Sequence, residues 1–93
     1  METLVLENHT LEGYAIRTEN TVLLLIKAKR GFLGCGYLSL ETANKVGDAA
    51  VIVSGVKNFE DMLNAKVKAV SDAAATLGID TTMTGRDALL KLV

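Results

Sequence analysis

Hydrophobic and polar positions alternate along the first third of the chain, which is typical of half-buried strands. The alternation runs through residues 4–10 and again through residues 14–18, and residues 8–13 have the composition of a turn. Residues 21–28 are apolar on both faces through their middle, as expected of a central strand that is covered on both sides. Residues 32–38 follow as a fourth strand, so the pattern predicts an antiparallel meander.

The hydrophobic period changes after the predicted fourth strand. Ser39 is a suitable N-cap for a short helix over residues 40–46, and Gly47 is placed to end that helix. Residues 49–53 then form a short apolar run that predicts a buried strand.

Apolar positions step by three or four from residue 59 onward, which indicates helical structure as far as Gly78. Asn58 is the predicted N-cap, and Asn64 lies mid-pattern, where it could divide the segment into two helices. Thr84 is placed to cap a final helix whose inward-facing residues are Ala88, Leu89 and Leu92. Strands followed by helices predict a single α+β domain over residues 1–93, with the helices on one face of a mainly antiparallel sheet.

Composition favours self-association and argues against two classes of partner. The 93 residues are 49% hydrophobic without a disulfide, and burial of part of this apolar surface between copies of the chain would add stability. We therefore expect a homo-oligomer. The net charge of −1 lacks the basic footprint of a nucleic-acid-binding protein.

The chain also has the features of a cytoplasmic protein. A single cysteine cannot form an internal disulfide, which fits a reducing compartment. The first residues do not have the pattern of a signal peptide. No apolar run is longer than residues 22–26, which is far shorter than the ~20 residues that a spanning helix needs. We expect no association with a membrane.

Cys35 is the main candidate for chemistry, because Gly34 and Gly36 leave it without bulky immediate neighbours. One interpretation is that the thiol packs in the sheet while the glycines relieve crowding. The alternative is a catalytic nucleophile or redox thiol, which needs a nearby base or cation. His9 would supply that base only if the first strand pairs close to Cys35.

A second candidate site follows the predicted strand over residues 49–53. Backbone N–H groups near Gly55, together with Lys57, could hold a carboxylate or phosphate. The simpler interpretation is that Gly55 makes a turn and Asn58 caps the next helix. Glu60 completes the set of candidate ligand-binding residues, although its carboxylate and that of Asp61 point about 100° apart on a helix. No spacing of His, Cys or acidic residues indicates a metal site, and no cofactor motif is present.

Several blocks of sequence together resemble the YunC-like proteins, which are small prokaryotic domains of unknown function. The blocks are residues 31–38 around Cys35, residues 53–65 with the Gly-Val and Glu-Asp pairs, and residues 77–89 near the C-terminus. Thr82 stands where the family usually has glycine, and Lys66 where proline often follows Ala65. The resemblance covers nearly the whole chain but implies no established activity.

Function is therefore predicted only in outline. The first hypothesis is a ligand-binding or structural module that self-associates, with a pocket between residues 34–36 and the loop over residues 55–61. The alternatives are an enzyme that uses Cys35 and an interaction subunit of a larger complex. The ligand of this first hypothesis would be a small molecule.

Overall fold

A six-stranded sheet, with its strands in the order in which they occur along the chain, organises the molecule. The computed structural model describes residues 1–93. The strands are β1 (Glu2–Leu6), β2 (His9–Arg17), β3 (Val22–Lys27), β4 (Phe32–Gly34), β5 (Ala50–Ile52) and β6 (Ala69–Val70). The helices are α1 (Leu40–Val46), α2 (Phe59–Asn64), α3 (Asp72–Thr76) and α4 (Gly85–Leu90). The α+β prediction is confirmed.

The first four strands form the predicted antiparallel meander. Two details of the prediction were wrong. The turn after β1 is confined to Glu7 and Asn8, which take positive φ angles of 45° and 72°, and the residues up to Gly13 continue the alternation as part of β2. The fourth strand ends at Gly34, because the chain turns there and the Leu38 N–H donates back to the Cys35 carbonyl at 3.1 Å.

The sheet is mixed because β5 pairs with β4 in parallel, after a crossover through α1. The predicted bounds of α1 are confirmed, with the Ser39 hydroxyl accepting a hydrogen bond from the Thr42 N–H and Gly47 in the left-handed conformation. Parallel neighbours need such a crossover, since a hairpin can only return the chain in the opposite direction.

The helical stripe from residue 59 is interrupted, as Asn64 suggested. The chain leaves α2 at Asn64 even though Lys66 replaces the usual proline, and it pairs with β5 as β6 before α3 begins. Ser71 fixes this arrangement: it is fully buried, and its hydroxyl accepts a hydrogen bond from the Ala50 N–H and donates one to the Asp48 carbonyl, both at 2.8 Å. The hydrophobic pattern of the sequence did not predict β6.

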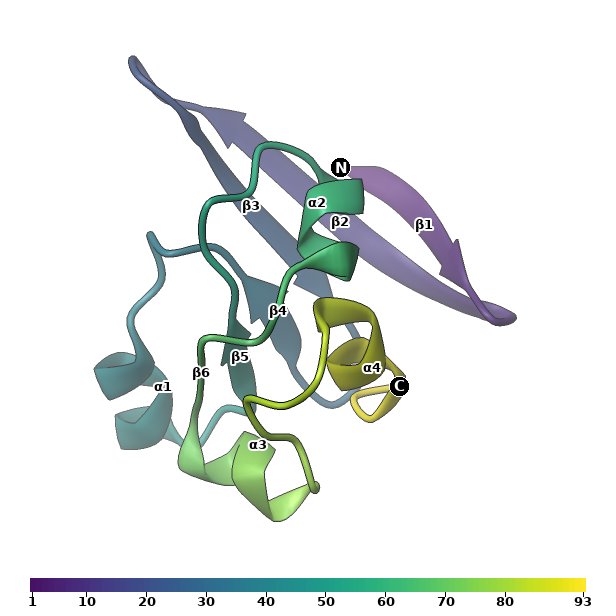
Figure 1. Cartoon of the computed structure of the whole chain (residues 1–93), viewed down its shortest axis with the longest axis vertical. Helices are drawn as coiled ribbons and strands as arrows, with labels where there is room; N and C mark the ends of the chain where they lie inside the picture. The colour runs from purple at the N-terminus through teal and green to yellow at the C-terminus, as the bar shows by residue number, and fades with distance from the viewer.

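Helices lie on both faces of the sheet. Leu33 faces the layer of α4, where its side chain lies against Gly85, and α2 lies beside α4 (Figure 1). Phe32, which points to the opposite face, lines a hollow together with residues of α1. The expectation of helices on one face is thus correct for α2 and α4 but not for α1.

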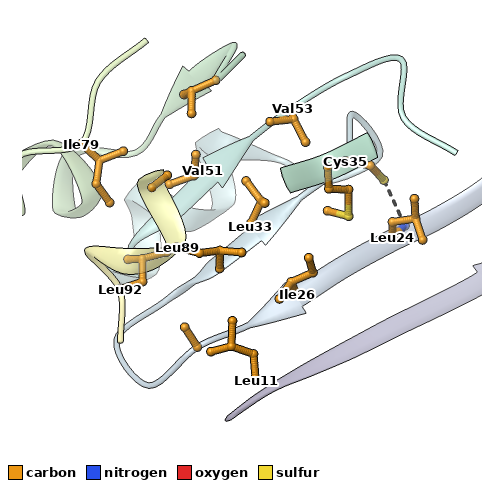
Figure 2. Close-up of a cluster of buried hydrophobic side chains, with 14 of the residues drawn as sticks. Leu11, Leu24, Ile26, Leu33, Cys35, Val51, Val53, Ile79, Leu89 and Leu92 are labelled. Carbon is orange, nitrogen blue, oxygen red and sulfur yellow. Dashed lines mark hydrogen bonds between the residues drawn. The ribbon is translucent and has the colours of Figure 1, made fainter. Parts of the chain in front are cut away.

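The core lies between the sheet and the later helices. Figure 2 shows Leu24 and Ile26 of β3, Leu33 of β4 and Val51 of β5 meeting Leu89 of α4 in one cluster. Along β3 only alternate residues are buried, so this strand is covered on one face and not on both as predicted. The uncovered face remains rich in apolar side chains.

Candidate functional site

A hollow of about 320 Å³ opens at the carboxyl ends of the parallel strands β4 and β5. It is bounded by the residues that follow each of these strands and by the start of β3. Its lining residues are Thr21, Val22, Cys35, Gly36, Tyr37, Ser54, Gly55 and Val56. The structure therefore brings together Cys35, Gly36 and Gly55 from the two segments that the sequence singled out.

The path of the chain explains why a hollow forms at this edge. After β4 the chain passes to α1 on one face of the sheet, and after β5 it passes to α2 on the other. The two loops diverge and leave a space between them. In open α/β sheets this point of divergence at the carboxyl ends of neighbouring strands is the usual position of a ligand.

Cys35 lies in the wall of the hollow and is 5% exposed. Its sulfur accepts a hydrogen bond from the Leu24 N–H, with N and Sγ 3.3 Å apart, and its own N–H donates to the Leu24 carbonyl at 3.1 Å (Figure 2). The residue thus extends the pairing of β3 and β4 by one position. No acidic, basic or histidine side chain is among the lining residues.

The two glycines that flank Cys35 have different roles. Gly34 is buried, and a Cβ there would collide with the Leu38 side chain, so this glycine makes room for a neighbour and not for a ligand. Gly36 is exposed, and a Cβ there would meet no protein atom within 4 Å. Neither glycine has a positive φ angle, so neither position requires glycine for its backbone conformation.

The loop after β5 divides into a part that lines the hollow and a part that caps α2. Gly55, at φ 70°, is in the lining, whereas Lys57, Asn58 and Glu60 are not. The Asn58 side chain accepts a hydrogen bond from the Asp61 N–H at 2.7 Å, as predicted for an N-cap. The reciprocal bond differs from a standard capping box, because the Asp61 carboxylate accepts from the Lys57 N–H at 3.1 Å.

His9 is too far from Cys35 to act as its base. It lies at the start of β2, whereas the backbone partner of Leu24 on that strand is Ala15. The separation along the strand is about 20 Å at the usual rise per residue. His9 lines a different, smaller hollow of about 180 Å³ next to Lys29.

The shifted pKa values in the molecule belong to groups outside the hollow. The side-chain hydrogen bond between the Tyr14 hydroxyl and Glu12 raises the pKa of Tyr14. Hydrogen bonds from the hydroxyl and the N–H of Thr82 lower the pKa of Asp80. The latter bonds also form the turn before Met83, although Thr82 replaces the usual glycine. No three His, Cys, Asp or Glu side chains are grouped so that they could hold a metal ion.

Sequence reasoning missed the lining residues that come from elsewhere in the chain. Val22 begins β3 and Thr21 directly precedes it, and both reach the hollow because β3 runs antiparallel to β4. Val56 lies within the predicted loop over residues 55–61 but was not named as a candidate, although an apolar residue directly after a loop glycine is a usable signal for a pocket wall.

The comparisons with known proteins identify a family. A family model described as a domain of unknown function, DUF1805, matches residues 34–92. The chain belongs to the DUF1805 family. The uncharacterized protein YunC of Bacillus subtilis (strain 168) is 27% identical over 94 residues, which cover 97% of this chain and 93% of that protein. The predicted resemblance to YunC-like proteins is confirmed.

A solved structure shares the fold. The crystal structure of TA1206, a protein of unknown function from Thermoplasma acidophilum, is 39% identical and has a TM-score of 0.94. It matches over 99% of this chain and 90% of that one. Both loops of the hollow lie within the range that the DUF1805 model matches. None of the helices has the length and apolar character needed to cross a lipid bilayer.

Proposed function

We propose that this DUF1805 domain is a binding module that takes a small molecule into the hollow at the ends of β4 and β5. The observation that carries the proposal is the divergence of the loops after two parallel strands, which creates the space for a ligand. The volume of about 320 Å³ falls at the lower end of the range of small-molecule pockets. A few polar groups among apolar lining residues match the usual composition of such pockets.

Gly36→Leu tests the proposal, because a side chain at this position enters free space next to the hollow. We would measure thermal unfolding of the wild type and the variant against a library of small metabolites. A ligand of the hollow should raise the midpoint of the wild type but not that of Gly36→Leu. Ala75→Leu, an exposed change on α3 outside the hollow, is the matched control and should respond like the wild type. The absence of any such ligand, or equal stabilisation of Gly36→Leu, would contradict the proposal.

Self-association is the second part of the proposal, and the uncovered face of the sheet supports it. Alternate residues of β1, β2 and β3 put Val5, Tyr14, Ile16, Leu23 and Leu25 on this face. Val5 is 71% exposed and Ile16 is 61% exposed. Exposed apolar side chains grouped in this way, here beside the charged residues Glu12 and Lys27, are typical of a surface that binds another protein surface, and a second copy of the chain is the partner that we propose.

The alternative function, an enzyme that uses Cys35, is supported by the position of the thiol in the wall of the hollow. The lining lacks a base, which favours binding over thiol chemistry. The rate at which a small alkylating reagent modifies Cys35 separates these functions. A packed thiol should react far more slowly in the native protein than in urea, whereas a catalytic thiol should react rapidly near neutral pH.

The remaining alternative, a subunit of a larger complex, would use the same uncovered sheet face. A different protein would then occupy the surface that we assign to a second copy of the chain. Self-association of the purified protein favours our proposal over this alternative.

A further inference from the structure

The wall of the hollow contains a backbone amide that has no partner within the protein. Val56 is 8% exposed, and its N–H donates no hydrogen bond to any protein group. Backbone N–H groups are almost always paired with protein or water, so one that lines a hollow without a protein partner is available to an acceptor from outside the chain. The N–H of the preceding residue, Gly55, is also free of protein partners.

Other residues that line the hollow carry further hydrogen-bond donors. The N–H groups of Gly36 and Tyr37, on the opposite loop, form no hydrogen bond with the protein. Ser54 and Thr21 add hydroxyl groups to the lining. Backbone N–H groups that point into one space attract a negatively charged oxygen, because each contributes a partial positive charge.

The charge and the apolar part of the lining restrict the ligand further. No lysine or arginine lines the hollow, so it offers no counter-charge to a doubly charged phosphate. A carboxylate carries a single charge and can accept several N–H bonds at once. Val22, Cys35 and Val56 provide apolar contact for the rest of the molecule.

We propose that the hollow binds a small organic acid, with its carboxylate on the amides of Gly55 and Val56 and a short apolar stem against Val22 and Cys35. This inference rests on the proposed binding function and specifies its ligand class. It requires no catalytic step and no cofactor.

The test is a titration of the nitrogen-15-labelled protein followed by the shifts of its amide resonances. The probes are sodium butyrate, its neutral isostere butyramide, and inorganic phosphate, all at constant ionic strength. We expect saturable shifts at Gly55 and Val56 with butyrate, and about tenfold weaker binding of butyramide, because a charged acceptor strengthens each hydrogen bond. Phosphate should bind more weakly than butyrate.

Variants at two glycines with the same backbone conformation provide the control. Gly55 and Gly47 both have positive φ angles, 70° and 86°, and a Cβ at either position meets no protein atom within 4 Å. Gly55→Ala and Gly47→Ala therefore introduce the same backbone strain, but only Gly55 lines the hollow. Butyrate binding should weaken in Gly55→Ala and persist in Gly47→Ala, and the spectrum of each variant reports whether it is folded.

Distinct outcomes would overturn the ligand class and the binding function separately. Equal binding of butyrate and butyramide at Gly55 and Val56 would overturn the carboxylate class while leaving a functional pocket. Tighter binding of phosphate would overturn it in favour of a phosphorylated ligand. Amide shifts that follow salt concentration alone, or that occur away from the hollow, would also overturn the carboxylate class. The metabolite screen with Gly36→Leu tests the binding function independently of the ligand class.

Discussion

The N–H of Leu24 donates to the sulfur of Cys35, with N and Sγ 3.3 Å apart, at the point where β4 has ended and the chain turns toward α1. The thiol thereby takes the place that a backbone carbonyl would occupy in a longer strand pair. Because this bond fixes Cys35 in the wall of the hollow, the residue has a structural role whether or not a ligand contacts it.

Removal of the Cys35 sulfur should destabilise the protein. Cys35→Ala leaves the Leu24 N–H without its acceptor, and we expect the free energy of unfolding to fall by about 1–3 kcal/mol. Cys35→Ser keeps an acceptor for the Leu24 N–H, so its free energy of unfolding should fall by less than that of Cys35→Ala. Urea denaturation of both variants measures the difference. An alanine variant as stable as the wild type would show that the bond to sulfur contributes nothing.

Alanine at the two glycines beside Cys35 should have opposite effects. Gly34→Ala forces the Leu38 side chain to move, and we expect a loss of about 1–3 kcal/mol. Gly36→Ala meets no protein atom and requires no unusual φ, so the stability should be unchanged or rise by up to about 1 kcal/mol. Thermal unfolding of the two variants measures this difference in stability. Similar losses of stability in Gly34→Ala and Gly36→Ala would refute the roles assigned to the two glycines.

Ser71 should be far more important for stability than an ordinary helix cap. Ser71→Ala removes the buried acceptor of the Ala50 N–H and the donor to the Asp48 carbonyl, and we expect a loss of about 2–4 kcal/mol. Ser39→Ala, at the exposed cap of α1, is the matched control and should cost about 1 kcal/mol. Chemical denaturation that gives equal losses for the two variants would contradict the structural role of Ser71.

A charge on the uncovered sheet face should prevent self-association. Ile16 and Ala15 are exposed neighbours on β2 whose side chains point to opposite faces. We expect Ile16→Lys to sediment as a 9.9 kDa monomer, whereas Ala15→Lys should associate like the wild type. A wild-type protein that is monomeric at micromolar concentration would remove this part of the proposal.

Elements marked at both ends by local signals were predictable from the sequence. Ser39 and Gly47 delimit α1 through a side-chain cap and a left-handed glycine, both of which depend on neighbouring residues alone. The capping box between Thr84 and Asp87 likewise starts α4 where the sequence placed it. These signals are reliable because each cap forms hydrogen bonds with backbone groups that lie only a few residues away in the sequence.

Elements that depend on distant partners were not predictable. β6 continues the helical spacing of apolar residues, yet Val70 pairs with Val51 and the segment becomes an edge strand. The hollow was foreseen at Cys35 and Gly55, but the contribution of Val22 depends on the register between β3 and β4. Such pairings are set by contacts across the sheet, which local periodicity does not encode.

A crystal structure of the protein soaked with a library of small fragments tests most directly whether the hollow beside Cys35 and Val56 is the ligand site. We expect bound fragments to lie in this hollow and to accept hydrogen bonds from the loop after β5. Fragments that bind only in the hollows near Arg30 or Val46, with none beside Cys35, would contradict it.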